Sequence, residues 1–195
     1  MVQLVEKIQR KSSVVPQPDM QEKFNRIPEP FSPKANLQWS PVWSMTQQRF
    51  RYLPTQYLYF KYPKQGELDC TIACSNGNAS GNTLEEAVLQ GFFELVERDA
   101  VAVWWYNQIP RPSVDISSYA DSAFDKLLRY YHQLGRKVWV LDLSHDLDIP
   151  AFVAVSSLAD NKSEQLLMGF GCHFDTRLAI GVNEGAKARI YGAGL

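Results

Sequence analysis

Two near-continuous apolar runs restrict the fold of this chain more than any other feature. The runs KVWVLDL (137–143) and AFVAVSS (151–157) are separated only by the polar stretch SHDLDIP. Apolar runs of this length, bounded by polar turns, are typical of buried strands. Strands buried in this way belong to a sheet that helices cover. The sequence therefore predicts an α/β (α+β) fold, with a mixed β-sheet packed with at least three helices.

Further elements are expected before and after these strands. A helix should begin after Thr83, which forms a capping box with Glu86, and should run to about Tyr106. A second helix is predicted over 119–135, where Gly135 takes the position that follows a helix. The other expected elements are strands at 57–62, 69–74 and 166–171 and a weak helix from about Asp175 that contains Gly181 and Gly185.

The first 56 residues differ in composition from the rest of the chain. Prolines are frequent there among scattered polar residues, so regular elements should be short. We expect a Pro-rich N-terminal arm at 1–56 and a globular domain at 57–195.

Composition excludes several classes of protein. A chain of 195 residues that is 45% hydrophobic is long enough for one globular domain, which excludes disorder of the whole. A formal net charge of -1 leaves no global field that would attract nucleic acid or an anionic membrane. No stretch approaches the about 18 apolar residues of a membrane span, and the first residues lack the apolar segment of a secretory signal. We expect a cytoplasmic protein that binds neither nucleic acid nor membrane.

The three cysteines do not indicate a disulfide framework. Cys70 and Cys74 would lie roughly 13 Å apart along the strand expected there, which disfavours a zinc pair. Cys172 has no evident partner for nucleophilic chemistry.

The helix expected after Thr83 carries its polar residues in one narrow stripe. At about 100° per residue, Glu86, Gln90, Glu94 and Glu97 lie within roughly 80° of one another, and a broad apolar face lies opposite. Carboxylates one turn apart repel, and Mg²⁺ is a natural compensating cation. Arg98 lies beside the stripe and could pair with a carboxylate or a phosphate. The alternative is a solvated acidic face, in which Glu86 only caps the helix.

The segment SNGNASGNTLEEAVLQGFFELVERDAVAVWWYN (75–107) resembles the signature segment of the YcaO superfamily. The resemblance is to the branch that forms azoline rings in thiazole/oxazole-modified peptides. The stretches 135–157 and 169–189 resemble the next two blocks of that family, in the same order. The resemblance covers about residues 25–190 and makes 57–195 a partial YcaO catalytic domain.

This resemblance implies an ATP-dependent cyclodehydration. A Cys, Ser or Thr side chain of a ribosomal precursor peptide attacks the preceding backbone amide, and ATP phosphorylates the resulting oxygen. Loss of phosphate then leaves a thiazoline or an oxazoline. The implied cofactors are ATP and Mg²⁺. The implied partners are the precursor peptide, an E1-like leader-binding protein and a flavin dehydrogenase of the same pathway, and a homodimer is also considered.

The family motif also implies site residues in this sequence. The ATP contacts that it assigns are Ser75, Gln90, Glu94, Glu97, Arg98 and Glu184, and the Mg²⁺ ligands are Glu94, Glu97 and Glu184. Two positions depart from the motif: Gln90 stands where the family usually has Ser, and Lys187 lies where a Gln is expected nearby. Family members continue for roughly as many residues again, so the chain is expected to be truncated. No catalytic residue is assigned.

Two other functions stay open. The chain could be a non-catalytic YcaO-like protein that binds a precursor peptide or a partner subunit. It could also perform a different amide activation, such as thioamide or amidine formation with an external nucleophile. Among the remaining residues, His173 is expected to be structural, with a direct role as the alternative. His132 and His145 are expected at the surface, and the aromatic run 104–106 in the core.

Overall fold

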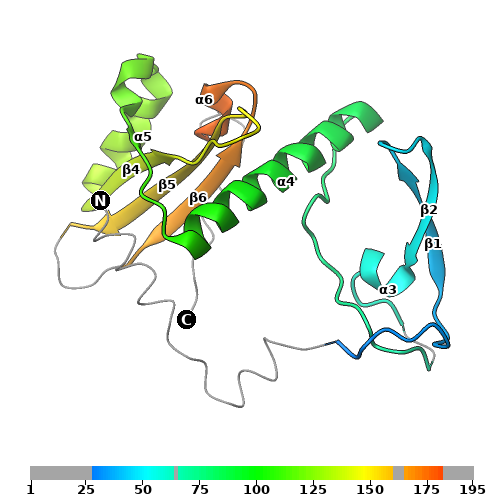
Figure 1. Ribbon diagram of the computed structural model, residues 1–195. Helices are drawn as coiled ribbons and strands as arrows, with labels where there is room; N and C mark the ends of the chain where they lie inside the picture. The colour runs from blue at the N-terminus through cyan, green and yellow to red at the C-terminus, as the bar shows by residue number, and fades with distance from the viewer. Residues whose placement is uncertain (1–27, 64–65, 160–164, 182–195) are drawn as a thin grey trace. The chain divides into compact units, whose positions relative to one another are not determined.

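The computed structural model describes residues 28–63, 66–159 and 165–181 of the chain (Figure 1). The described residues fall into two compact units that divide between Ser75 and Asn76. The domain boundary expected at residue 56 concerns the organisation of the whole protein and stays a prediction. Within the described ranges, no helix combines the length and the apolar character needed to cross a membrane.

The first unit contains a β-hairpin and a short helix. Strand β1 (Trp39–Ser44) pairs antiparallel with β2 (Arg49–Pro54), and α3 (Thr55–Leu58) follows directly. The rings of Trp43 and Phe50 pack edge to face across the hairpin with centroids 5.2 Å apart. As the frequent prolines predict, the elements are short.

The prediction of strands at 57–62 and 69–74 is wrong. Residues 55–58 form α3 instead, and residues 69–74 belong to no strand. The side chain of Gln56 is buried and donates from Nε2 to the Leu68 carbonyl oxygen at 2.8 Å, which holds this turn of helix against the following segment. Tyr57, Tyr59 and Phe60 are exposed. A strand needs a sheet to pair with, so aromatic composition alone does not make one.

The second unit is built on a four-stranded sheet. In the order β3-β4-β5-β6, its strands are β3 (Ser113–Val114), β4 (Arg136–Asp142), β5 (Ala151–Leu158) and β6 (Leu167–Cys172). The three strands expected from the apolar runs are therefore confirmed, and so is the α+β class. The pairings among the described strands are all antiparallel rather than mixed. The connections 143–150 and 159–166 are too short for the crossover that parallel neighbours need.

Helices cover both faces of this sheet. They are α4 (Leu84–Asn107), α5 (Ser122–Gln133) and the short α6 (Thr176–Ala179), with a 3₁₀ turn at Ile116–Tyr119. Figure 1 shows α4 running along β6, and α5 on the far side beside β4. The helix predicted over 119–135 begins later, because Asp121 caps it by accepting from the Ala123 amide at 2.8 Å.

The core consists of two clusters, because successive residues of a strand face opposite sides. The cluster with α4 contains Ala100, Trp104, Leu141, Leu143, Ala151, Val153 and Val155. The cluster with α5 and α6 contains Ile116, Phe124, Val140, Phe152 and Ala179. Both faces of β4 and β5 are buried, which explains why the sequences of these strands are continuous apolar runs.

Candidate functional site

The N-terminus of α4 is fixed by reciprocal capping contacts. The Thr83 hydroxyl accepts a hydrogen bond from the Glu86 amide at 3.2 Å, as the capping box predicts. The Glu86 carboxylate reaches back to the amide of Asn82, at 2.7 Å, rather than to that of Thr83. These contacts set where α4 begins and hence the direction in which its polar stripe points.

The polar stripe of α4 borders a cavity of about 760 Å³. One wall combines this stripe with the segment before the helix and is lined by Asn78, Ala79, Ser80, Glu86, Gln90, Glu94, Glu97 and Arg98. Cavities that bind small molecules commonly enclose about 300 to 1,000 Å³. The stripe predicted from the helical spacing therefore faces a space large enough for a small-molecule ligand.

The opposite wall is mainly apolar. It is formed by the α5 side of the sheet together with α5 and α6, and includes Leu127, Val138, Phe152, Ala154 and Leu167. Gly169 of β6 also lines the cavity, and a methyl group added there would meet no atom within 4 Å. The cavity thus joins an apolar region to an acidic one, and a ligand with one flat apolar part and one highly charged part would match both.

Two carboxylates and one guanidinium dominate the charge of the polar wall. Arg98 places Nε 3.6 Å from Glu94 Oε1 and Nη2 3.5 Å from Glu97 Oε1. The Glu97 side chain is only 15% exposed, and this burial raises the pKa of Glu97, as does the charge of Glu94, while Arg98 opposes the rise. With Glu86, which also lines this wall, three carboxylates stand against one guanidinium here. The wall can therefore accept a further cation.

Glu94 is also held from the segment before the helix. The amide of Gly77 donates to Glu94 Oε2 at 2.7 Å, so the two oxygens of this carboxylate have different partners. Gly77 adopts the left-handed region, with φ +82°, which allows the chain to turn onto the helix at this point.

Cys172, at the end of β6, lies close enough to Glu97 for the charge of the carboxylate to change the pKa of the thiol. Burial, and then the negative charge of Glu97, raise the pKa of the Cys172 thiol to about 11. The side chain therefore stays protonated at neutral pH, in keeping with the absence of nucleophilic character expected from the sequence.

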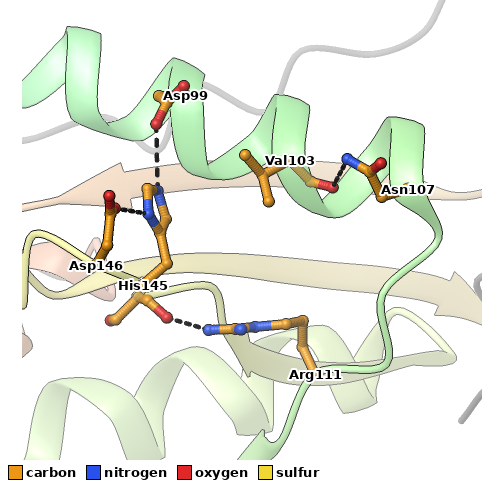
Figure 2. A network of polar contacts seen from close by, with 7 residues as sticks. Asp99, Val103, Asn107, Arg111, His145 and Asp146 are labelled. Atoms are coloured by element: carbon orange, nitrogen blue, oxygen red, sulfur yellow. Dashed lines mark hydrogen bonds and ion pairs between the residues drawn. The ribbon is translucent and has the colours of Figure 1, made fainter.

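A separate polar network joins α4 to the turn between β4 and β5, and Figure 2 shows it. His145 places Nε2 3.4 Å from Asp99 Oδ2, and its Nδ1 contacts Asp146. Arg111 donates from Nε to the Asp142 carbonyl oxygen at 2.7 Å and from Nη2 to that of Ser144. His145 was expected at the surface, and its side chain is half-buried there, 19% exposed between α4 and this turn.

The other two histidines and the aromatic run behave mostly as expected. His132 is exposed, and His173 packs on Phe93 while its Nδ1 accepts from the Asp175 amide at 2.9 Å. Trp104 is a core residue at 1% exposure. Tyr106, however, is 81% exposed, because it lies about 200° around α4 from the buried Trp104 and therefore on the opposite side of the helix.

A comparison with protein families identifies the family of this fold. Residues 6–182 match the family model described as "YcaO cyclodehydratase, ATP-ad Mg2+-binding". The chain belongs to the YcaO family. Both the capped helix α4 and the cavity beside it lie within the matched range.

Two curated relatives are uncharacterized proteins. One, from Methanothermobacter thermautotrophicus, is 30% identical over 75% of this chain and 39% of its own length. The other, encoded in the tfuA 3' region of Rhizobium leguminosarum bv. trifolii, is 38% identical over 60% of this chain and 30% of its own length. The YcaO chain described here thus spans between 30% and 39% of these relatives.

This YcaO chain is similar to solved structures of heterocyclases. A heterocyclase in complex with substrate and cofactor is 51% identical, with a TM-score of 0.74 over 79% of this chain and 21% of the other. The heterocyclase TruD is 48% identical, with a TM-score of 0.72 over 83% of this chain and 25% of TruD. YcaO from Methanopyrus kandleri, bound with AMPPCP and Mg²⁺, is 24% identical with a TM-score of 0.61 over 73% of this chain and 37% of the other, and shares the fold.

The structure brings together four of the six site residues that the YcaO motif assigns. Gln90, Glu94, Glu97 and Arg98 line one cavity. Ser75 is exposed and belongs to the first unit, whereas Ser80, farther along the connecting segment, lines the cavity of the second. Sequence reasoning singled out the segment but not Ser80, since the left-handed turn at Gly77 decides which residues face α4. Glu184 and Lys187 lie outside the described residues.

Proposed function

We propose that this YcaO chain binds ATP and Mg²⁺ for the cyclodehydration of Cys, Ser or Thr residues in a ribosomal precursor peptide. One observation carries the proposal: Glu94, Glu97 and Arg98, which match the family motif, line the same cavity of about 760 Å³. The heterocyclase in complex with substrate and cofactor, at 51% identity, supports this class of reaction.

The residues of the polar wall suit Mg²⁺. Among the described residues, no group of three His, Cys, Asp or Glu side chains could hold a metal ion by itself. Mg²⁺ does not need such a group, because proteins usually hold it through one or two carboxylates together with phosphate oxygens and water. Glu94 and Glu97 supply the two carboxylates, and Glu184 is proposed as a third ligand. The donor set is therefore one that suits Mg²⁺ in a nucleotide site.

The cavity also suits a nucleotide. Its apolar wall, which includes Leu127, Val138 and Phe152, offers a surface for a flat base, and its opposite wall carries the charged groups. Bound ATP supplies the phosphoryl group that activates the amide oxygen, and Mg²⁺ neutralises developing charge. Of the chain's own residues, Arg98 can pair with a phosphate oxygen and Gln90 can donate a hydrogen bond to one. Ser75 and Glu184 stay proposed ATP contacts.

The proposed partners follow from the same reaction. They are the precursor peptide, an E1-like protein that binds its leader and a flavin dehydrogenase, for a protein that works in the cytoplasm. Because the chain spans a minor part of its relatives, the activity is proposed for the whole protein and nucleotide binding for the chain described here.

A binding experiment on the chain tests the proposal without requiring turnover. AMPPCP and Mg²⁺ together should raise the melting temperature, because a ligand at 100 times its Kd stabilises the folded state by about 2.7 kcal/mol. Glu94→Gln and Glu97→Gln remove carboxylates while keeping side-chain size, so each should abolish most of the Mg²⁺-dependent rise.

Glu85→Gln is the matched control, because Glu85 is exposed on the same helix and does not line the cavity. It should leave the rise unchanged. Equal melting shifts in the wild type, Glu94→Gln and Glu97→Gln would remove the site assignment. The absence of any shift in the wild type would instead favour a non-catalytic protein that binds a peptide or a subunit. Nucleotide binding followed by thioamide or amidine products would favour the other amide activation.

A further inference from the structure

The segment before α4 lies on the helix at a point where the helix has no side chain. Gly91 is buried, and a Cβ added to it would lie 2.6 Å from the Gly77 carbonyl oxygen. No real Cβ approaches a backbone oxygen so closely, so any other residue at 91 must displace the peptide of Gly77. A helix interior favours Ala over Gly by about 1 kcal/mol. Gly91 therefore lowers the intrinsic stability of α4.

The same residue, Gly77, holds one of the proposed Mg²⁺ ligands through its amide. Three residues after Gly91, Glu94 accepts the Gly77 amide hydrogen on Oε2 at 2.7 Å. The carbonyl of Gly77 thus rests on Gly91, and its N–H is bound to Glu94. The two groups belong to successive peptide units that meet at the Gly77 Cα, so a Cβ at position 91 that pushes the carbonyl away also shifts the residue whose N–H holds Glu94.

A hydrogen bond of this kind can orient a metal ligand. Groups that hydrogen-bond a ligating carboxylate fix its direction, and their loss typically lowers metal affinity about 10-fold to 100-fold. Without the Gly77 amide, the partner left to Glu94 among the described residues would be Arg98, whose Nε lies 3.6 Å from Oε1 and draws the carboxylate along the helix. The Gly77 contact is thus the one that fixes Oε2 beside the cavity.

We propose that Gly91 is a positioning residue of the cation site: its missing side chain lets the Gly77 peptide lie on α4, where the amide aligns Glu94 for Mg²⁺. The inference rests on the proposed function and adds a positioning role to a residue outside the binding motif. Gly91 does not itself touch the ligand.

The test is Gly91→Ala in the full chain. Circular dichroism should show an intact fold, because the preference of a helix for Ala, about 1 kcal/mol, offsets part of the cost of displacing the Gly77 carbonyl. Titration of Mg²⁺ into the chain with AMPPCP should show an affinity for Mg²⁺ at least about 10-fold lower than that of the wild type. Binding of AMPPCP without Mg²⁺ should change much less. Val88→Ala changes an exposed part of the same helix, and it should leave both the Mg²⁺ affinity and the AMPPCP affinity unchanged.

A double-mutant cycle separates positioning from a general structural effect. If Gly91 acts through Glu94, then adding Gly91→Ala to Glu94→Gln should lower Mg²⁺ affinity no further. An equal loss in both backgrounds would overturn the inference, and so would wild-type Mg²⁺ affinity in Gly91→Ala.

Amide exchange gives a readout that needs neither ligand nor the Gly91 variant. The Gly77 amide should be protected in the ligand-free wild type and should exchange at least about 10-fold faster in Glu94→Ala, which removes its acceptor. Equal exchange rates would overturn the inference. A wild-type chain that binds no AMPPCP while the Gly77 amide behaves as expected would count against the proposed function, not against the Gly77–Glu94 contact.

Discussion

At the scale of single residues, the environment of Glu97 and Cys172 links the acidic wall to the end of β6. Burial is the main cause of the raised pKa of both groups, and the negative charge of Glu97 is the second cause for Cys172. A raised thiol pKa means less thiolate at any pH below it. With a pKa of about 11 against the ordinary 9.0, Cys172 holds about 100-fold less thiolate at neutral pH.

The rate of alkylation measures the thiolate fraction of Cys172 directly. With iodoacetamide at pH 8, Cys172 should react much more slowly than Cys74, which is exposed, and its rate should keep rising as the pH approaches about 11. Glu97→Gln should speed the reaction of Cys172 but not bring it to the rate of Cys74, because burial remains. Peptide mass spectrometry distinguishes the two sites, and Glu85→Gln serves as the control. A Cys172 rate that does not respond to Glu97→Gln would show that the carboxylate is not close to the thiol.

At the scale of elements, α4 begins at a hydrogen-bonded cap, and its apolar residues divide into a buried group and an exposed group. Phe93, Val96, Ala100 and Trp104 are buried against the sheet or its loops. Val88, Phe92 and Leu95 belong to the same broad apolar face expected from the sequence, yet they are 39%, 42% and 50% exposed. The helical period identified the apolar residues correctly, but a flat sheet covers only part of so wide a face.

Removal of the cap should weaken the second unit. Thr83→Ala deletes the acceptor of the Glu86 amide, and loss of such a cap typically costs about 1 kcal/mol. Chemical denaturation followed by circular dichroism should show a lower midpoint with an unchanged slope. Thr83→Ser keeps the hydroxyl and should retain nearly all of the stability. Equal midpoints for the Ala and Ser variants would show that the cap contributes nothing.

At the scale of the whole molecule, the two compact units differ in how much of their backbone is protected. Strand β5 lies between β4 and β6, and its residues Val153 and Val155 are completely buried. The hairpin β1–β2 has only two strands, with Phe50 and Tyr52 both 63% exposed. A two-stranded hairpin is marginally stable by itself.

Hydrogen exchange should therefore rank the strands. Amides of β5 at 151–158 should exchange slowest, at rates set by global opening of their unit, and hairpin amides that bond across β1 and β2 should exchange at least about 10-fold faster. Exchange followed by mass spectrometry of short peptides resolves the two segments. Hairpin amides as slow as those of β5 would show that the first unit is held by more than its own contacts.

Local patterns predicted most of the second unit. The capping box at Thr83 placed the start of α4, the apolar runs placed β4 and β5, and helical spacing put Gln90, Glu94 and Glu97 on one side. Each of these depends on neighbours within a few residues. The aromatic run at 57–62 failed because nothing within it reveals whether a sheet edge is available, and Gln56 instead forms a contact twelve residues away with Leu68.

What the sequence determined by itself is the set of elements of the second unit and the polar stripe of α4, because periodicity and capping act within a single turn or strand. The tertiary structure alone decided that the stripe borders a cavity, that Ser80 lines it, that His145 is half-buried beside α4, and that the Gly77 carbonyl lies on Gly91. These facts depend on segments that meet after folding, and packing and hydrogen bonds between separate elements leave no periodic pattern in the chain.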